Sequence, residues 1–159
     1  MNKKKKINRF VGLSLLLLAV FALIVYAASI QLSPSACNGQ WSSCTRAFTN
    51  NAERATFTAG DTTNGTGVWK TYGFYPTYIK DSAIITDVTV RADFYASTTK
   101  GFIDVKVSGD GGVTHGSSHV VGGNTAEQTF NINVTNDLAW TPSMFSNNNF
   151  RVNATCFKS

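Results

Sequence analysis

The cysteines are the residues whose type and spacing define a chemistry most clearly. The chain has 3 cysteines, and two of them, Cys37 and Cys44, lie in one short polar segment. A disulfide between them would close a small loop and stabilise the fold by about 2 kcal/mol, because it restricts the unfolded chain. Cys44–Cys156 is the alternative pairing, and either choice leaves one thiol over. We favour Cys37–Cys44 because it requires no assumption about topology, and Cys156 then fits a small buried hydrophobe.

Metal-binding residue types are present, but their spacing matches no known metal site. His115 and His119 do not complete a zinc pattern with the cysteines, and they lie in a Gly- and Ser-rich stretch. Asp104 and Asp110 are candidate calcium ligands, yet the chain has neither an EF-hand loop nor a glycine-rich calcium repeat. The sequence therefore predicts no metal and no cofactor, with surface calcium at loop carboxylates as the alternative.

Residue types needed for catalysis occur without a recognisable arrangement. No Gly-x-Ser-x-Gly motif is present, and the 9 acidic residues fall mostly at positions where strands should face solvent. The sequence therefore predicts a protein that is not an enzyme.

Aromatic residues provide a candidate contact surface instead. Trp69, Tyr75 and Tyr78 lie in one aromatic-rich window, and we expect them to be exposed. Exposed aromatic rings stack on sugars or pack against a neighbouring subunit. These residues are therefore the candidate ligand or partner surface, with ordinary core and loop packing as the alternative.

Asparagine supplies a further chemistry, because Asn64, Asn133 and Asn153 each begin an Asn-x-Thr glycosylation sequence. Asn133 and Asn153 lie on the polar side of their predicted strands, and Asn64 lies in a predicted turn. We therefore expect all three side chains to face solvent.

The N-terminal residues have the pattern of a targeting segment. Four lysines occupy residues 3–6 and an arginine residue 9, and an uncharged run follows from residue 10 to residue 28. A basic start followed by an apolar stretch and small residues is typical of a secretory signal peptide. The run approaches the roughly 20 residues that span a bilayer, so an uncleaved membrane anchor is the alternative. Both interpretations predict export of the rest of the chain to the cell surface or medium.

Net charge does not indicate nucleic-acid binding. The formal net charge is +5, from 14 basic and 9 acidic residues, but five of the basic residues precede residue 10. The remainder is neutral, so no basic surface for phosphates is expected.

Alternating apolar and polar residues predict β-strands for nearly all of the exported part. The clearest segments are 86–96, 103–108, 130–135 and 150–156, and weaker ones are 54–59, 68–74 and 119–121. A short helical turn is expected at residues 141–145, since Pro142 suits a first helical position. The expected core consists of Val88, Val90, Phe94, Ile103, Val105, Val107, Phe130, Ile132, Val134, Phe150 and Val152.

These strands predict an all-β fold, an antiparallel β-sandwich with jelly-roll-like topology behind one N-terminal hydrophobic helix. An up-and-down barrel is the alternative. We divide the chain into residues 1–29 as signal peptide or membrane anchor, 30–40 as polar linker or exchanged strand, and 41–159 as the sandwich domain.

The order of motifs resembles small β-sandwich modules of secreted and cell-surface proteins of archaea and bacteria, and of phage tail-associated proteins. The segments that carry this resemblance are Trp41, Ala47-Phe48, Ala55-Thr56, Gly73-Phe74, residues 85–90, residues 105–112, Trp140-Thr141-Pro142, Phe145-Ser146 and residues 150–152. They are core and turn residues, so the resemblance implies a fold and a surface location but no catalytic residues.

Together these observations predict an exported structural or adhesive cell-surface protein, including a subunit of an extracellular filament. In that case residues 30–36 would pair with an open sheet edge of a neighbouring copy. The alternative is a secreted carbohydrate-binding module. Self-association or contact with other surface components is expected, with glycans as alternative partners.

Overall fold

The computed structural model describes residues 28–48, 55–57 and 64–159, so the predicted N-terminal helix lies outside the described residues. By its contacts the chain divides into two units, residues 1–30 and residues 31–159. The second unit is all-β. Its described strands and 3₁₀ turns are β1 (Ala36–Gly39), η1 (Cys44–Phe48), β2 (Gly65–Lys70), β3 (Thr89–Phe94), β4 (Gly101–Ser108), β5 (His119–Gly122), β6 (Gln128–Asn133), η2 (Pro142–Phe145) and β7 (Arg151–Lys158).

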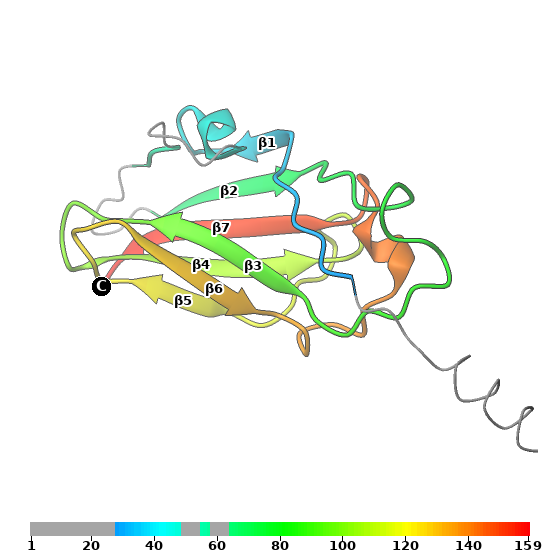
Figure 1. The fold of residues 1–159 in the computed structure, drawn as a ribbon. Coiled ribbons are helices and arrows are strands. Elements are labelled where there is room, and N and C mark those ends of the chain that lie inside the picture. The colour runs from blue at the N-terminus through cyan, green and yellow to red at the C-terminus, as the bar shows by residue number, and fades with distance from the viewer. Residues whose placement is uncertain (1–27, 49–54, 58–63) are drawn as a thin grey trace, which may run out of the picture. The chain divides into compact units, whose positions relative to one another are not determined.

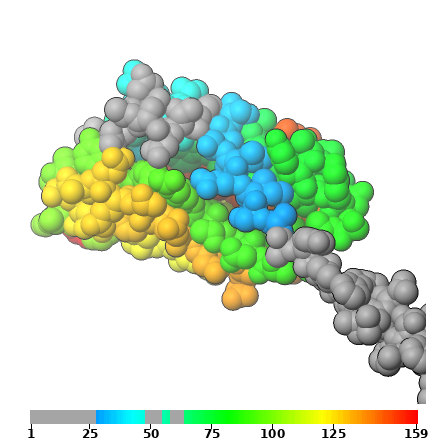
Figure 2. Space-filling model, viewed as in Figure 1, coloured from blue at the N-terminus to red at the C-terminus, as the bar shows by residue number. Residues whose placement is uncertain are grey.

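The described strands form two antiparallel sheets (Figure 1). One sheet has five strands in the order β1-β2-β7-β4-β5, and the other pairs β3 with β6. Strand β7 is central, because it pairs along its length with both β2 and β4. Figure 2 views the unit from the side of β3 and β6, whose atoms cover much of this face.

Period-two alternation decides which side chains enter the core. In β7, Val152, Ala154 and Cys156 are buried, whereas the residues between them are only partly covered. Strand register aligns these positions with the apolar positions of β2 and β4, so that Val152 lies opposite both Trp69 and Val107. One face of the five-stranded sheet is therefore apolar.

Side chains of both sheets meet in a single core. Val105 and Val107 of β4, Ile132 of β6 and Val134 just after it belong to one cluster of buried residues. An aromatic group closes one end of this core, where Phe150 packs edge-on against Tyr72 and stacks on Phe145 with ring centroids 5.3 Å apart. Burial raises the pKa of the Tyr72 hydroxyl above its ordinary value.

The sequence-based core is confirmed, with eight of its residues buried and the other three, Val90, Phe94 and Phe130, partly buried against the same cluster. The four clear strand segments each contain a strand, and the turn at Pro142–Phe145 is present. Of the weaker segments, 54–59 lies mostly outside the described residues, and residues 71–74 of segment 68–74 lie beyond the end of β2.

The segment at residues 30–40, expected as polar linker or exchanged strand, contains a strand that pairs within this chain. Residues Ala36–Gly39 form β1, which pairs with β2 of the same chain. Backbone hydrogen bonds to β2 hold β1 in place. The Cys37–Cys44 disulfide is present and links β1 covalently to η1. This confirms the preferred cysteine pairing, and Cys156 is the remaining thiol, buried at 7% exposure.

Among the residues that the structure describes, no helix is long and apolar enough to cross a membrane.

The core makes a direct stability prediction. Phe150→Ala removes a buried ring that contacts several aromatic neighbours, and we expect it to lower the free energy of unfolding by about 3–5 kcal/mol. Val113 is 83% exposed, so Val113→Ala should change that free energy by less than about 0.5 kcal/mol. Urea unfolding monitored by circular dichroism provides both values. Equal effects of the two substitutions would contradict the assigned core.

Thiol titration tests the cysteine assignment. Burial raises the pKa of the Cys156 thiol, so the folded, non-reduced protein should react negligibly with a thiol reagent. The same protein unfolded without reductant should expose one thiol per chain. Three reactive thiols, or a dimer linked by disulfides, would contradict the assignment.

Candidate functional site

The second face of the five-stranded sheet carries polar side chains and a hollow. Register places Lys70 opposite Arg151 and Val68 opposite Asn153, so these four outward residues of β2 and β7 are immediate neighbours. The loop between β4 and β5 reaches this face, since His115 contacts the Asn153 side chain and Gly111 and Gly112 line the hollow.

Asp110 organises that loop. Its carboxylate accepts bonds from the Ser108 hydroxyl at 2.7 Å, from the Thr114 hydroxyl at 2.6 Å and from the backbone N–H groups of Val113 and Thr114. The Thr114 and Ser108 bonds hold the pKa of Asp110 well below its ordinary value. Ser108 is fully buried, and its oxygen also accepts the Gly112 N–H. The loop is therefore a fixed wall of the hollow.

The hollow has a volume of about 310 Å³. Its lining residues are Asn38, Val68, Lys70, Gly111, Gly112, His115, Arg151 and Asn153. This set includes two permanently charged bases and no carboxylate. The electrostatic character of the hollow is therefore positive.

Arg151 and Asn153 are both held in place at the floor. The Arg151 guanidinium donates to the carbonyl oxygens of Asn147, Asn148 and Phe150 at 2.7–2.9 Å. The Asn153 amide nitrogen contacts His115 Nε2 across the hollow, whereas its Oδ1 is buried and has no hydrogen-bond partner among the described residues. The floor thus holds an oriented cation, and a buried acceptor without a described partner lies on the neighbouring side chain.

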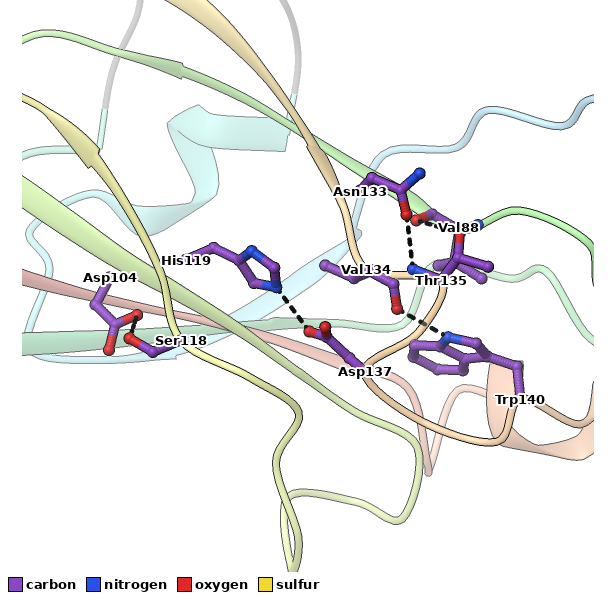
Figure 3. Close-up of polar contacts among 9 residues, drawn as sticks. All are labelled: Val88, Asp104, Ser118, His119, Asn133, Val134, Thr135, Asp137 and Trp140. Carbon is purple, nitrogen blue, oxygen red and sulfur yellow. Dashed lines mark hydrogen bonds and ion pairs between the residues drawn. The ribbon is translucent and has the colours of Figure 1, made fainter.

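A second polar cluster joins the start of β5 to the segment after β6 (Figure 3). His119 Nε2 lies 2.8 Å from Asp137 Oδ2, and the Asp137 side chain is only 8% exposed. The Ser118 hydroxyl donates to Asp104 at 2.6 Å rather than to His119. A serine nucleophile would need its hydroxyl bonded to the imidazole. The His119–Asp137 contact therefore links β5 to the segment after β6.

The predicted aromatic surface is wrong for Trp69. Its side chain is 8% exposed, it packs edge-on against Trp41, and its Nε1–H donates to the Cys44 carbonyl. The alternation of β2 explains this, because Trp69 shares the inward face with two buried glycines. Tyr75 is half-buried and donates to Asp81, which raises the pKa of its hydroxyl. Tyr78 is exposed at 55%.

The candidate metal residues are separated and engaged elsewhere. His115 faces Asn153 and His119 faces Asp137, while Asp104 pairs with Lys106 at 3.3 Å. Within the described ranges, no group of three or more His, Cys, Asp or Glu side chains lies close enough to hold a metal ion.

Glycosylation sequences differ in their accessibility. Asn64 and Asn133 are exposed as expected, but Asn153 is partly buried on the floor of the hollow. Its position between β2 and β4, with the β4–β5 loop folded over it, is the reason for this difference.

Sequence reasoning did not identify the hollow. In the sequence, Lys70 and Arg151 contribute only to the neutral net charge of the exported part, and Asn38 lies in the predicted linker. Alternation along their strands places Lys70 and Arg151 on the outward side. Only the register of β2 with β7 shows that they are neighbours.

Comparisons of the chain with known protein families, with curated proteins and with solved structures find no match.

The Asp110 bonds predict how the loop responds to charge and pH. Asp110→Asn should speed hydrogen exchange of the Val113 and Thr114 amides, whereas Asp81→Asn, in a different loop, should leave them unchanged. Because the pKa of Asp110 is lowered on folding, its stabilisation is present at neutral pH and is lost as pH falls through the folded value. Protection in the unmodified protein should therefore persist below pH of about 3.9, the ordinary aspartate pKa. Loss of protection near pH 5 would contradict this role.

Proposed function

We propose that the chain is an exported structural or adhesive protein of the cell surface. Its body is a β-sandwich of the jelly-roll type, and copies assemble into a filament by strand pairing. The function is not catalytic. The observation that carries the proposal is a coil segment before β1 that has no backbone hydrogen bond with a described residue.

That segment comprises residues 31–34 of the second unit and runs as coil toward β1 (Figure 1). None of its backbone groups has a hydrogen bond with a described residue, whereas Ser35 N–H already bonds to β2 and the residue after it. Burial alternates along it, with Leu32 and Pro34 half-buried and Gln31 and Ser33 exposed. Such alternation is typical of a strand, and an extended, unpaired strand readily adds to an open sheet edge.

Strand topology supports an acceptor for this segment. In an eight-stranded jelly roll, the second, seventh, fourth and fifth strands form one sheet, and the first, eighth, third and sixth form the other. The order β2-β7-β4-β5 agrees with the first of these sheets, and β3-β6 agrees with half of the second. Strand β1 is attached to β2 instead, and the described residues hold no eighth strand. The outer edge of β3 therefore has no hydrogen-bonded strand among the described residues, and unpaired edges are templates for a strand from another chain.

Export rests on the sequence of residues 1–28 and on the disulfide. The basic start and apolar run match a signal or anchor. The Cys37–Cys44 bond is compatible with an oxidising location outside the cytoplasm. Carbohydrate binding through aromatic stacking is the weaker alternative, because Trp69 is buried and leaves Tyr78 as the exposed ring.

Electron microscopy and sedimentation of the full chain test the assembly. We expect filaments or large oligomers, and Leu32→Asp should abolish them because a charge on the inward side of the segment opposes docking. Ser33→Asp adds the same charge on the exposed side and serves as the matched control. Thermal unfolding of both variants shows whether the fold is retained. A strictly monomeric protein, or equal behaviour of the two variants with an intact fold, would contradict the proposal.

A further inference from the structure

We propose that the hollow over β2 and β7 binds a small carboxylate that also carries hydroxyl groups, which is the chemistry of an acidic sugar residue. This binding site lies on the outward face of the five-stranded sheet. It goes beyond the assembly proposed above and does not depend on it.

The positive charge of the hollow is not neutralised by any of its described lining residues. Lys70 and Arg151 lie side by side through the register of β2 with β7, and the lining holds no carboxylate. The Lys70 ammonium group has no hydrogen bond or ion pair with a described residue, although the backbone carbonyl of Lys70 accepts the Ser35 N–H. By contrast, Lys106 on the same face pairs with Asp104 at 3.3 Å. An anion in the hollow would therefore meet a lysine whose charge is available.

Arg151 adds directional donors. A guanidinium has five N–H groups, and three of those of Arg151 bond to loop carbonyls. Two N–H groups remain, on a side chain whose orientation is already fixed. Planar guanidinium groups recognise carboxylates through paired N–H donors, and little entropy is lost when the group is held beforehand.

The uncharged lining favours a ligand with hydroxyl groups. The Asn153 Oδ1 atom is a buried acceptor without a partner among the described residues, and such an atom is costly to leave unpaired. The terminal torsion of asparagine is soft, so a modest turn of the amide would present this oxygen to a donor in the hollow. A carboxylate alone has no such donor, whereas a sugar hydroxyl group does. Asn38 and His115 offer further polar contacts at the rim.

Size and lining restrict the ligand further. The volume of about 310 Å³ lies at the lower end of the roughly 300–1,000 Å³ typical of small-molecule sites. No Phe, Tyr or Trp is among the described residues that line the hollow, so recognition through carboxylate and hydroxyl groups is favoured over stacking of a neutral sugar. The site therefore suits one acidic ring read by its carboxylate and hydroxyl groups.

The test is a titration of the full chain in detergent, followed by amide NMR, with galacturonate, galactose and inorganic phosphate as probes. We expect saturable shifts for galacturonate at Lys70, His115 and Asn153, and weaker binding as salt is raised. Galactose, which lacks the carboxylate, and phosphate, which lacks the sugar hydroxyls, should each bind at least about tenfold more weakly.

Matched lysine variants locate the binding. Lys70→Gln should weaken galacturonate binding about tenfold, while Lys106→Gln, on the same face, should change it by less than about twofold. The unchanged spectrum of each variant outside the hollow verifies its fold. Absence of saturable galacturonate binding would overturn the proposal, and so would galactose or phosphate binding as tightly as galacturonate. Equal effects of the two lysine substitutions would also overturn it.

Discussion

Pairing of β7 with both β2 and β4 is the constraint on which the remaining structure depends. These two ladders align residues 151–158 with strands distant in sequence, and β7 alternates strictly between buried and partly exposed residues. Because side chains of a strand alternate between faces, a slip of one residue would exchange the faces completely. One register therefore fixes both the apolar core, through Val152 and Ala154, and the positive hollow, through Arg151 and Asn153.

Local alternation made the strands and most of the core predictable from the sequence. Residues such as Val105 and Ile132 lie in segments where period two is uninterrupted, so their inward side follows directly. Strand β1 is too short and too polar for this signal, and its position depends on a disulfide and on a partner strand. Trp69 was predicted at the surface because it lies in a segment rich in aromatic residues. That composition does not indicate which face of β2 a side chain occupies, and Trp69 is buried. The hollow was not predictable, since its residues lie far apart in sequence and meet only through strand register and the fold of the β4–β5 loop.

The two proposed roles use different parts of the unit. Assembly involves the segment before β1 and the edge of β3, which belongs to the two-stranded sheet. Ligand binding involves the opposite, outward face of the five-stranded sheet. An exposed face on a repeating subunit would present the same site many times along a filament, and multiple weak sites bound together raise the overall avidity. This arrangement would suit adhesion to a surface rich in acidic sugars.

Cross-strand NMR contacts in the folded protein test the central register most directly. The account predicts close backbone and side-chain contacts of Val152 with both Val107 and Trp69, and of Arg151 with Lys70 on the opposite face. Contacts shifted by one residue along β7 would contradict it, because Arg151 and Asn153 would then face the core and the hollow would not exist.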